Sequence, residues 1–106
     1  MNETVADPQA LNEHTAAHLA ELFGAFGDTS RVRIVSVLMD GECNVTTIVK
    51  AVGLTKSAVS HHLRVLRDRG VVRAERRGAY VYYCAASDEL RPAIEAARAL
   101  LEDTSA

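Results

Sequence analysis

Two helical patterns near the middle of the sequence are separated by only three residues, Gly53-Leu54-Thr55. The first pattern has apolar residues at i, i+3, i+4 and i+7, the spacing of one helix face: Val45, Ile48, Val49 and Val52. The second runs to Arg69-Gly70, and its apolar stripe consists of Val59, Leu63 and Leu66. Gly53 ends the first helix and Thr55 caps the second, so the chain turns sharply between them. This spacing predicts a helix-turn-helix over residues 45–69.

The hydrophobic pattern changes from a helical period to a strand period directly after this motif. Residues 71–76 and 80–84 are two β-rich runs, and Arg77-Gly78-Ala79 lies between them. Two such runs around a glycine turn predict a hairpin, which we expect over residues 71–86. A hairpin directly after a helix-turn-helix indicates the wing of a winged helix.

Further helical patterns flank this central unit. We expect a first helix from Pro8, behind a capping Asp7, to about Ala25, and a second over residues 29–39. The helical period returns for a last helix over residues 88–102. The fold class is therefore mainly α with a β-hairpin wing, in the order α-α-α-α-β-β-α. We expect one winged helix-turn-helix domain over residues 1–106, with a frayed N-terminus at residues 1–7.

Composition excludes several classes of protein. The chain is 48% hydrophobic and 25% charged, without low-complexity segments, which argues against wholesale disorder and against a fibrous fold. No apolar stretch approaches the ~18 residues of a membrane span, and no basic segment precedes an apolar one as in a signal peptide. Two cysteines are too few for a secreted disulfide scaffold. We therefore expect a soluble cytoplasmic protein.

Charge is distributed unevenly along the chain. The net charge is −2, yet residues 50–77 carry eight basic and two acidic side chains, whereas the remainder carries four basic and twelve acidic ones. A basic segment on an otherwise acidic protein is typical of a surface that binds nucleic acid. A solvated helix face is the simpler alternative, but such faces usually alternate in sign.

The second helix of the motif carries polar side chains opposite its apolar stripe. At about 100° per residue this face holds Ser57, Ser60, His61, Arg64 and Asp68. Such groups can reach base edges and phosphates in the major groove, so we expect double-stranded DNA as a partner. An ordinary surface helix of a bundle is the alternative, and the arginines of the hairpin argue against it. The candidate DNA-binding residues are Thr55, Lys56, Ser57, Ser60, His61, Arg64, Arg73, Arg76 and Arg77.

These candidates divide into two expected roles. We expect His61 and Arg64 to contact bases, because both lie on the exposed face of the second helix. We expect Arg76 and Arg77 at the hairpin to hold backbone phosphates with little sequence preference.

Three ordered segments resemble the ArsR/SmtB family of winged-helix repressors: Leu22–Ile34, Ser57–Leu66 and Gly78–Tyr83. The resemblance covers about residues 19–101, and Thr29 departs from it because the family commonly has proline there. It implies a homodimer, joined through the first and last helices, that binds a pseudo-palindromic operator and leaves it when an inducer binds. The last helix supports a dimer independently, because a small monomer would have little to cover its alanine-rich apolar stripe. Burial of that stripe within one subunit is the alternative.

The sequence lacks the residues that the resemblance would place at two familiar metal sites. The usual cysteine position before the third helix holds Asn44, and Cys43 lies one residue early. The stretch that corresponds to the second site contains no histidine and offers Ser87, Glu89, Leu100 and Asp103. Because carboxylates alone bind soft divalent metals poorly, a zinc site of this kind is not expected.

Two histidines form one other candidate sensor site. His14 and His18 are at i and i+4 on the first helix, so both rings can meet one metal ion. Carboxylates on the last helix of a second subunit would complete the shell: Glu95, Glu102 or Asp103. Nickel or cobalt suits such a nitrogen and oxygen site better than zinc, copper(I) or cadmium. Two exposed histidines without a metal are the alternative.

Cys43 and Cys84 form the other candidate, a thiol or redox site. In a winged helix the stretch before the third helix pairs with the outer wing strand, which would bring the two cysteines close together. A disulfide or persulfide bridge between them would strain the wing. The alternative is that both are small buried apolar residues, the commonest fate of a free cysteine.

The sequence thus predicts a sequence-specific DNA-binding transcriptional regulator, a repressor whose operator affinity changes with a metal ion or a thiol signal. A winged-helix module that contacts protein, without ligand sensing, is the alternative from a different class. It predicts weak DNA affinity that is insensitive to salt. An enzyme is not expected, because no Ser-His-Asp or Cys-His arrangement is indicated.

Overall fold

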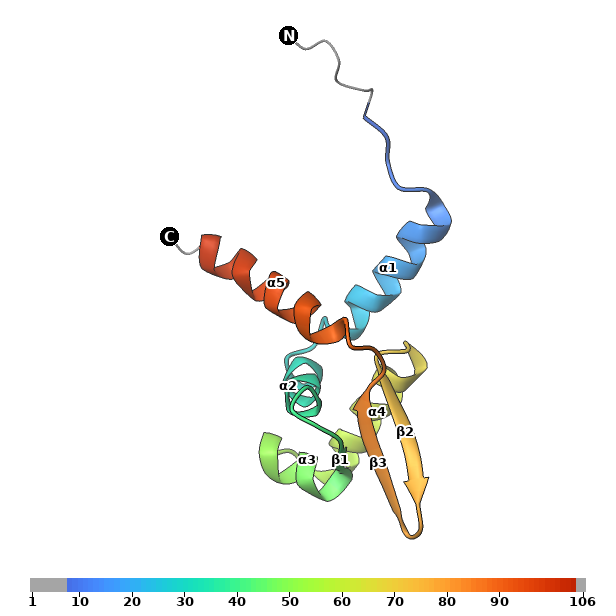
Figure 1. Cartoon of the computed structure of the whole chain (residues 1–106), viewed down its shortest axis with the longest axis vertical. Helices are drawn as coiled ribbons and strands as arrows, with labels where there is room; N and C mark the ends of the chain where they lie inside the picture. Colours follow the sequence, from blue (N-terminus) through green and yellow to red (C-terminus); the bar gives the residue numbers. More distant parts are fainter. Residues whose placement is uncertain (1–7, 105–106) are drawn as a thin grey trace.

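The computed structural model describes residues 8–104, with side chains through Glu102, and shows five helices and one three-stranded sheet in that part of the chain (Figure 1). In chain order the elements are α1 (Glu13–Ala25), α2 (Thr29–Leu38), β1 (Cys43–Asn44), α3 (Val45–Val52), α4 (Lys56–Asp68), β2 (Val72–Arg77), β3 (Tyr80–Ala85) and α5 (Leu90–Thr104). The predicted order of helices and hairpin is confirmed, with the short strand β1 added. The predicted frayed terminus, residues 1–7, lies outside the described residues.

α1 begins at Glu13 and not at Pro8, because Asn12 supplies its N-cap. The Asn12 side chain accepts a hydrogen bond of 2.9 Å from a backbone amide in the first turn, and asparagine caps a helix about as well as aspartate. Leu11, just before the cap, is 63% exposed, so no packing supports an additional turn. The predicted cap, Asp7, lies outside the described residues.

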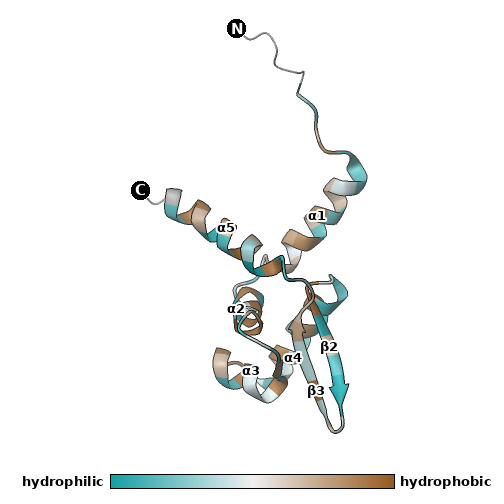
Figure 2. Cartoon of the chain, viewed as in Figure 1, coloured by the Kyte–Doolittle hydropathy of each residue, from teal (hydrophilic) through white to brown (hydrophobic). Residues whose placement is uncertain are grey.

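The hydrophobic core lies where α2, α3 and α4 meet the base of the hairpin. Its largest fully buried side chains are Ile34, Val35, Ile48, Val59, Leu63 and Leu66. In Figure 2 the apolar colouring is strong along α2, whereas β2 is hydrophilic over most of its length. The predicted apolar stripe of α4 therefore faces the core, which leaves the opposite face of this helix toward solvent.

Gly53 and Thr55 shape the turn between α3 and α4. Gly53 closes α3 with a φ of 71°, a left-handed conformation that favours glycine. The Thr55 hydroxyl caps α4 by accepting a hydrogen bond of 3.1 Å from a backbone amide of the first turn. Leu54 lies half-buried between them and packs against the core. The predicted helix-turn-helix is confirmed.

The sheet has the strand order β1-β3-β2, with both neighbouring pairs antiparallel, so β3 is its central strand and not an outer one. Because side chains alternate along a strand, the register divides the hairpin into two faces. The inner face, which turns toward α4, holds Val72, Ala74, Arg76, Val81, Tyr83 and Ala85. The outer face holds Arg73, Glu75, Arg77, Tyr80, Tyr82 and Cys84.

α1 and α5 extend away from the winged-helix body as two diverging arms (Figure 1). Several of their apolar side chains lie in solvent: Phe23 is 65% exposed, Leu100 69% and Leu101 70%. The predicted stripe of α5 is therefore half-buried at Leu90, which packs against the core, and exposed at Leu100 and Leu101, so burial inside a single subunit does not extend to the end of the stripe. No helix in the described part of the chain is long and apolar enough to cross a membrane.

Candidate nucleic-acid interface

α4 presents its predicted polar face to solvent. Ser57, Ser60, His61, Arg64 and Asp68 are all exposed, whereas Val59, Leu63 and Leu66 of the same helix are buried in the core. Within the described residues, Arg64 makes no hydrogen bond or ion pair with another side chain, so its guanidinium is available to a partner. Thr55, Lys56 and Ser57 lie at the helix start, where backbone amides point outward and favour an anion.

Arginine contacts fix α4 on the side that faces α1 and α2. Arg31 donates a hydrogen bond of 2.8 Å to the carbonyl of Ala25, and another of its nitrogens lies 3.4 Å from His62 Nδ1. Arg69 donates a hydrogen bond of 2.8 Å to the carbonyl of Glu21. These contacts join α4 to the neighbouring helices. The side chains of His62 and Arg69 therefore already have partners within the chain.

The other side of α4 borders a hollow of about 540 Å³ that separates this helix from β3. Its lining residues are Ser60, Leu63, Arg64, Arg67, Asp68 and Tyr83. Arg67 was not among the predicted DNA-binding residues. The signal was present in the sequence, because its i+3 spacing from Arg64 places both guanidinium groups on the same side of the helix.

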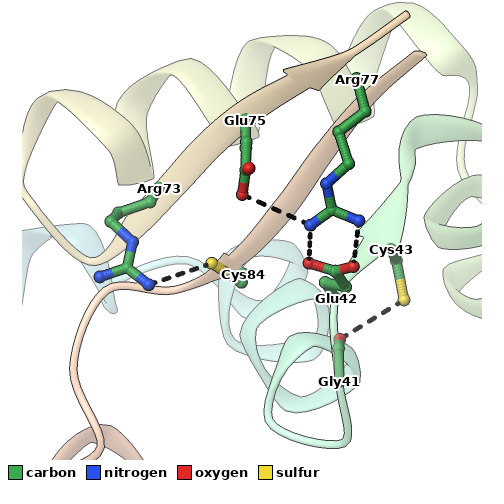
Figure 3. Close-up of polar contacts among 7 residues, drawn as sticks. All are labelled: Gly41, Glu42, Cys43, Arg73, Glu75, Arg77 and Cys84. Carbon is green, nitrogen blue, oxygen red and sulfur yellow. Dashed lines mark hydrogen bonds and ion pairs between the residues drawn. The ribbon is translucent and has the colours of Figure 1, made fainter.

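Arg77, at the end of β2, is engaged within the chain. It donates two hydrogen bonds to the carboxylate of Glu42, at 2.6 and 2.5 Å, and a third of 3.4 Å to Glu75 (Figure 3). Its guanidinium also lies over the Tyr82 ring, 4.8 Å from the centroid. The hydrogen bonds from Arg77 hold the pKa of the Glu42 carboxyl below its usual range, and those carboxylates raise the pKa of Arg77. A DNA phosphate at Arg77 would therefore have to displace a bidentate carboxylate.

The other two predicted wing arginines lie on opposite faces of the hairpin. Arg73, on the outer face, donates to the carbonyl of Ala86 at 3.4 Å and to the sulfur of Cys84 at 3.6 Å. The side chain of Arg76, on the inner face, makes no hydrogen bond or ion pair with any residue that the structure describes. Among these arginines, Arg76 combines a free guanidinium with a position on the side of α4.

Cys43 pairs with Tyr83 between β1 and β3, which confirms the predicted contact of this stretch with the wing. The expected approach of the two thiols does not follow, because Cys84 is the next residue along β3 and its side chain leaves the other face of the sheet. Both cysteines are free, and their sulfur atoms point apart in Figure 3. Burial raises the pKa of the Cys43 thiol, and two nearby carboxylates raise it further.

His14 and His18 lie side by side on α1, with their ring centroids 4.4 Å apart and both side chains exposed. The described residues contain no group of three or more histidine, cysteine or acidic side chains that could hold a metal ion. Glu95 and Glu102, predicted as further ligands, form i,i+4 ion pairs with arginines of α5. The side chain of Asp103 lies outside the described part. Within the described part of the chain, these two histidines therefore offer only two of the donors that a metal ion needs.

A helix-turn-helix followed by a wing, with free polar groups on the second helix, defines a winged helix-turn-helix protein. Residues 28–74 match the family model of the bacterial regulatory proteins of the arsR family. The chain is 37% identical over 83 residues to the transcriptional repressor SmtB homolog of Synechocystis sp., which covers 78% of this chain and 63% of that protein. It is 40% identical over 73 residues to the HTH-type transcriptional regulator NmtR of Mycobacterium tuberculosis, with 69% and 61% covered.

A solved structure, HlyU from Vibrio cholerae N16961, superposes with a TM-score of 0.76 at 30% identity, over 84% of this chain and 97% of that one. The chain belongs to the ArsR/SmtB family of winged helix-turn-helix transcriptional regulators. The curated relatives are named transcriptional regulators and not enzymes. The chain spans 63% and 61% of the length of the two curated relatives.

Proposed function

We propose that this chain is a DNA-binding transcriptional repressor that acts as a homodimer, with α4 in the major groove of its operator. The observation that carries the proposal is the exposed face of α4, where His61 and Arg64 project from a helix whose other side is buried. Guanidinium and imidazole groups can hydrogen-bond to the base edges that distinguish one base pair from another. Because the core and the Thr55 cap already fix this helix, little ordering is needed before it binds.

The surroundings of α4 favour a polyanion as the partner. Residues 50–77 supply eight of the twelve lysines and arginines of the chain. The free guanidinium of Arg76 lies on the same side of the wing as α4. Backbone amides at the start of α4, next to Lys56, add a site for a phosphate.

The two arms favour a homodimer. Phe23 on α1, and Leu100 and Leu101 on α5, are apolar and exposed in one chain, and burying them against a second copy removes this surface from water. A two-fold dimer presents two α4 helices to half-sites about 34–36 Å apart along the DNA. The operator we propose is therefore pseudo-palindromic.

The arms also offer a site for an inducer. His14 and His18 lie on the exposed surface of α1, and their adjacent rings can both turn a nitrogen toward one nickel or cobalt ion. Acidic side chains of α5 in the second copy, such as Glu95 and Glu102, would supply the remaining donors. A metal that binds between α1 of one copy and α5 of the other would change the angle between the two wings, and with it the affinity for the operator.

The test is the DNA affinity of the wild-type protein across a range of salt concentrations, measured by fluorescence anisotropy. One duplex is selected from a random pool by the protein, and the other has a scrambled sequence. We expect tighter binding to the selected duplex, and a steep fall in affinity for both as salt rises, because phosphate contacts release counterions. Weak binding without sequence preference or salt dependence would contradict the proposal and favour a module that contacts protein.

A further inference from the structure

The hollow between α4 and β3 has the chemistry of an anion site. The lining residues with hydrogen-bond donors in their side chains are Ser60, Arg64 and Arg67 on α4 and Tyr83 on β3. Asp68 is the single acidic residue among the lining side chains, so positive charge is in excess. A volume of about 540 Å³ leaves ample room for a phosphate group.

The arginine side chains that line this hollow are free to bind a ligand, and the strand opposite them, β3, is held in place by its neighbours. Within the described residues, the side chains of Arg64 and Arg67 make no hydrogen bond or ion pair, whereas the side chain of Arg69 on the opposite side of the helix donates to a backbone carbonyl. Tyr83 is half-buried, and its strand is paired on both sides, with Cys43 and with Ala74. A ligand would therefore meet unoccupied guanidinium groups opposite a rigid strand.

The hollow also lies where one strand of a duplex would pass. A helix in the major groove and a wing that reaches the neighbouring groove are separated by a single sugar–phosphate backbone. α4 and β3 form the two sides of that passage, and Arg76 lies on the same face of the hairpin, nearer the tip of the wing. A backbone running along this line would bring one phosphate into the hollow.

We infer that this hollow is a phosphate-binding site, in which Arg67 and the Tyr83 hydroxyl hold one phosphate of the DNA backbone. The inference rests on the proposed function, since it assumes that α4 enters the major groove. The guanidinium of Arg67 presents paired N–H donors that match two phosphate oxygens. Such a contact fixes how the protein sits on the duplex and reads no bases.

The test compares Arg67→Gln, Arg67→Lys and Tyr83→Phe with the wild type, and uses Arg98→Gln as a control that removes the same charge from the exposed side of α5. Affinities for the selected and the scrambled duplex are measured across a range of salt concentrations. We expect Arg67→Gln to weaken both about tenfold and to lower the salt slope by about one. Arg67→Lys keeps the slope but loses affinity, because it lacks the paired donors.

The other two variants test the contribution of the Tyr83 hydroxyl and the effect of losing a positive charge far from the hollow. Tyr83→Phe should lower affinity for both duplexes with an unchanged slope, because it removes one neutral donor. Arg98→Gln should match the wild type. An Arg67→Gln protein with wild-type affinity and slope would overturn the inference. A loss confined to the selected duplex would overturn it too, because Arg67 would then read bases.

A second experiment tests the phosphate site without DNA, and so independently of the proposed function. Inorganic phosphate is titrated into ¹⁵N-labelled wild-type and Arg67→Gln protein without DNA, and the arginine side-chain and β3 amide resonances are followed by NMR. If the wild-type protein binds no DNA, this result contradicts the proposed function but not the phosphate site. Phosphate-dependent shifts at Arg67 and Tyr83, lost in the variant, would then support a phosphate site filled from a free phosphate. The absence of both DNA binding and such shifts would overturn the site.

Discussion

The guanidinium of Arg77 donates two parallel hydrogen bonds to the carboxylate of Glu42, at 2.6 and 2.5 Å, and lies over the ring of Tyr82. We call these three residues the wing latch, because they join β2 to the segment before β1 on the outer face of the sheet. Both charged partners are more than two-fifths exposed, so solvent screening leaves the pair little weight in global stability. We expect the wing latch instead to hold the wing in its position relative to β1.

The two arginines near the wing tip should contribute differently to DNA binding. We expect Arg76→Gln to lower the salt slope by about one, because its guanidinium is free and faces the side of α4. Arg77→Gln should leave the slope nearly unchanged, because Glu42 already neutralises this charge. Anisotropy titrations over a range of salt concentrations measure both slopes. Equal losses from the two variants would mean that DNA displaces Glu42, and that the latch opens on binding.

The wing latch should open in acid. Because the pKa of Glu42 is lowered in the folded chain, the pair is fully formed above the usual glutamate range near 4.3 and is lost as pH falls through the lower folded-state value. NMR spectra from pH 7 to pH 3 should therefore show the Arg77 side-chain and Tyr82 ring signals moving together, at a midpoint below that range. Glu42→Gln should show the open-latch signals at every pH. Shifts in this variant that match the wild type would assign the transition to another group.

Mild oxidation should not create a disulfide within one chain. Cys43 and Cys84 leave opposite faces of the sheet, so bridging them would require β1 to separate from β3. The Cys43 thiol should also react slowly with iodoacetamide at neutral pH, because burial raises its pKa and keeps it protonated. Mass spectrometry after oxidation and after timed alkylation measures both. A rapidly formed intramolecular bridge would show that the wing opens in solution.

Metal binding should depend on the paired histidines of α1. We expect nickel or cobalt to bind the dimer near neutral pH and to dissociate in acid, because only a neutral imidazole is a ligand. Isothermal titration calorimetry should detect this binding in the wild type and lose it in the His14→Ala, His18→Ala double variant. His61→Ala, which removes an exposed histidine from α4, is the matched control. If the double variant and the wild type bind the metal identically, these histidines are ordinary surface residues and not metal ligands.

The helices and the wing could be predicted because their signals are local. The apolar spacing of α3 and α4, the glycine between them and the β-rich runs around Gly78 each act within a few residues. The predicted start of α1 at Pro8 was wrong. Asp7 and Asn12 are both suitable capping residues, and the choice between them depends on whether Leu11 finds a packing partner. Such a partner is a property of the whole fold and not of the segment.

The roles of the wing residues were not predictable in the same way. Which face Arg73, Arg76 and Arg77 occupy depends on the register of β2 against β3, and a shift of one residue would exchange all three. The pairing of Arg77 with Glu42 joins residues 35 apart in sequence, and no local pattern specifies it. The hollow beside Arg67 likewise exists only once the wing has folded against α4.

The most direct test of the central claim, that α4 reads an operator, is the ratio of affinities for the selected and the scrambled duplex. We predict that a His61→Ala, Arg64→Ala double variant folds as the wild type does, because both side chains are exposed. Its ratio should fall by at least about tenfold, since each lost base contact costs ~1–3 kcal/mol. A double variant that discriminates between the two duplexes as well as the wild type does would contradict the assignment of α4 to the major groove.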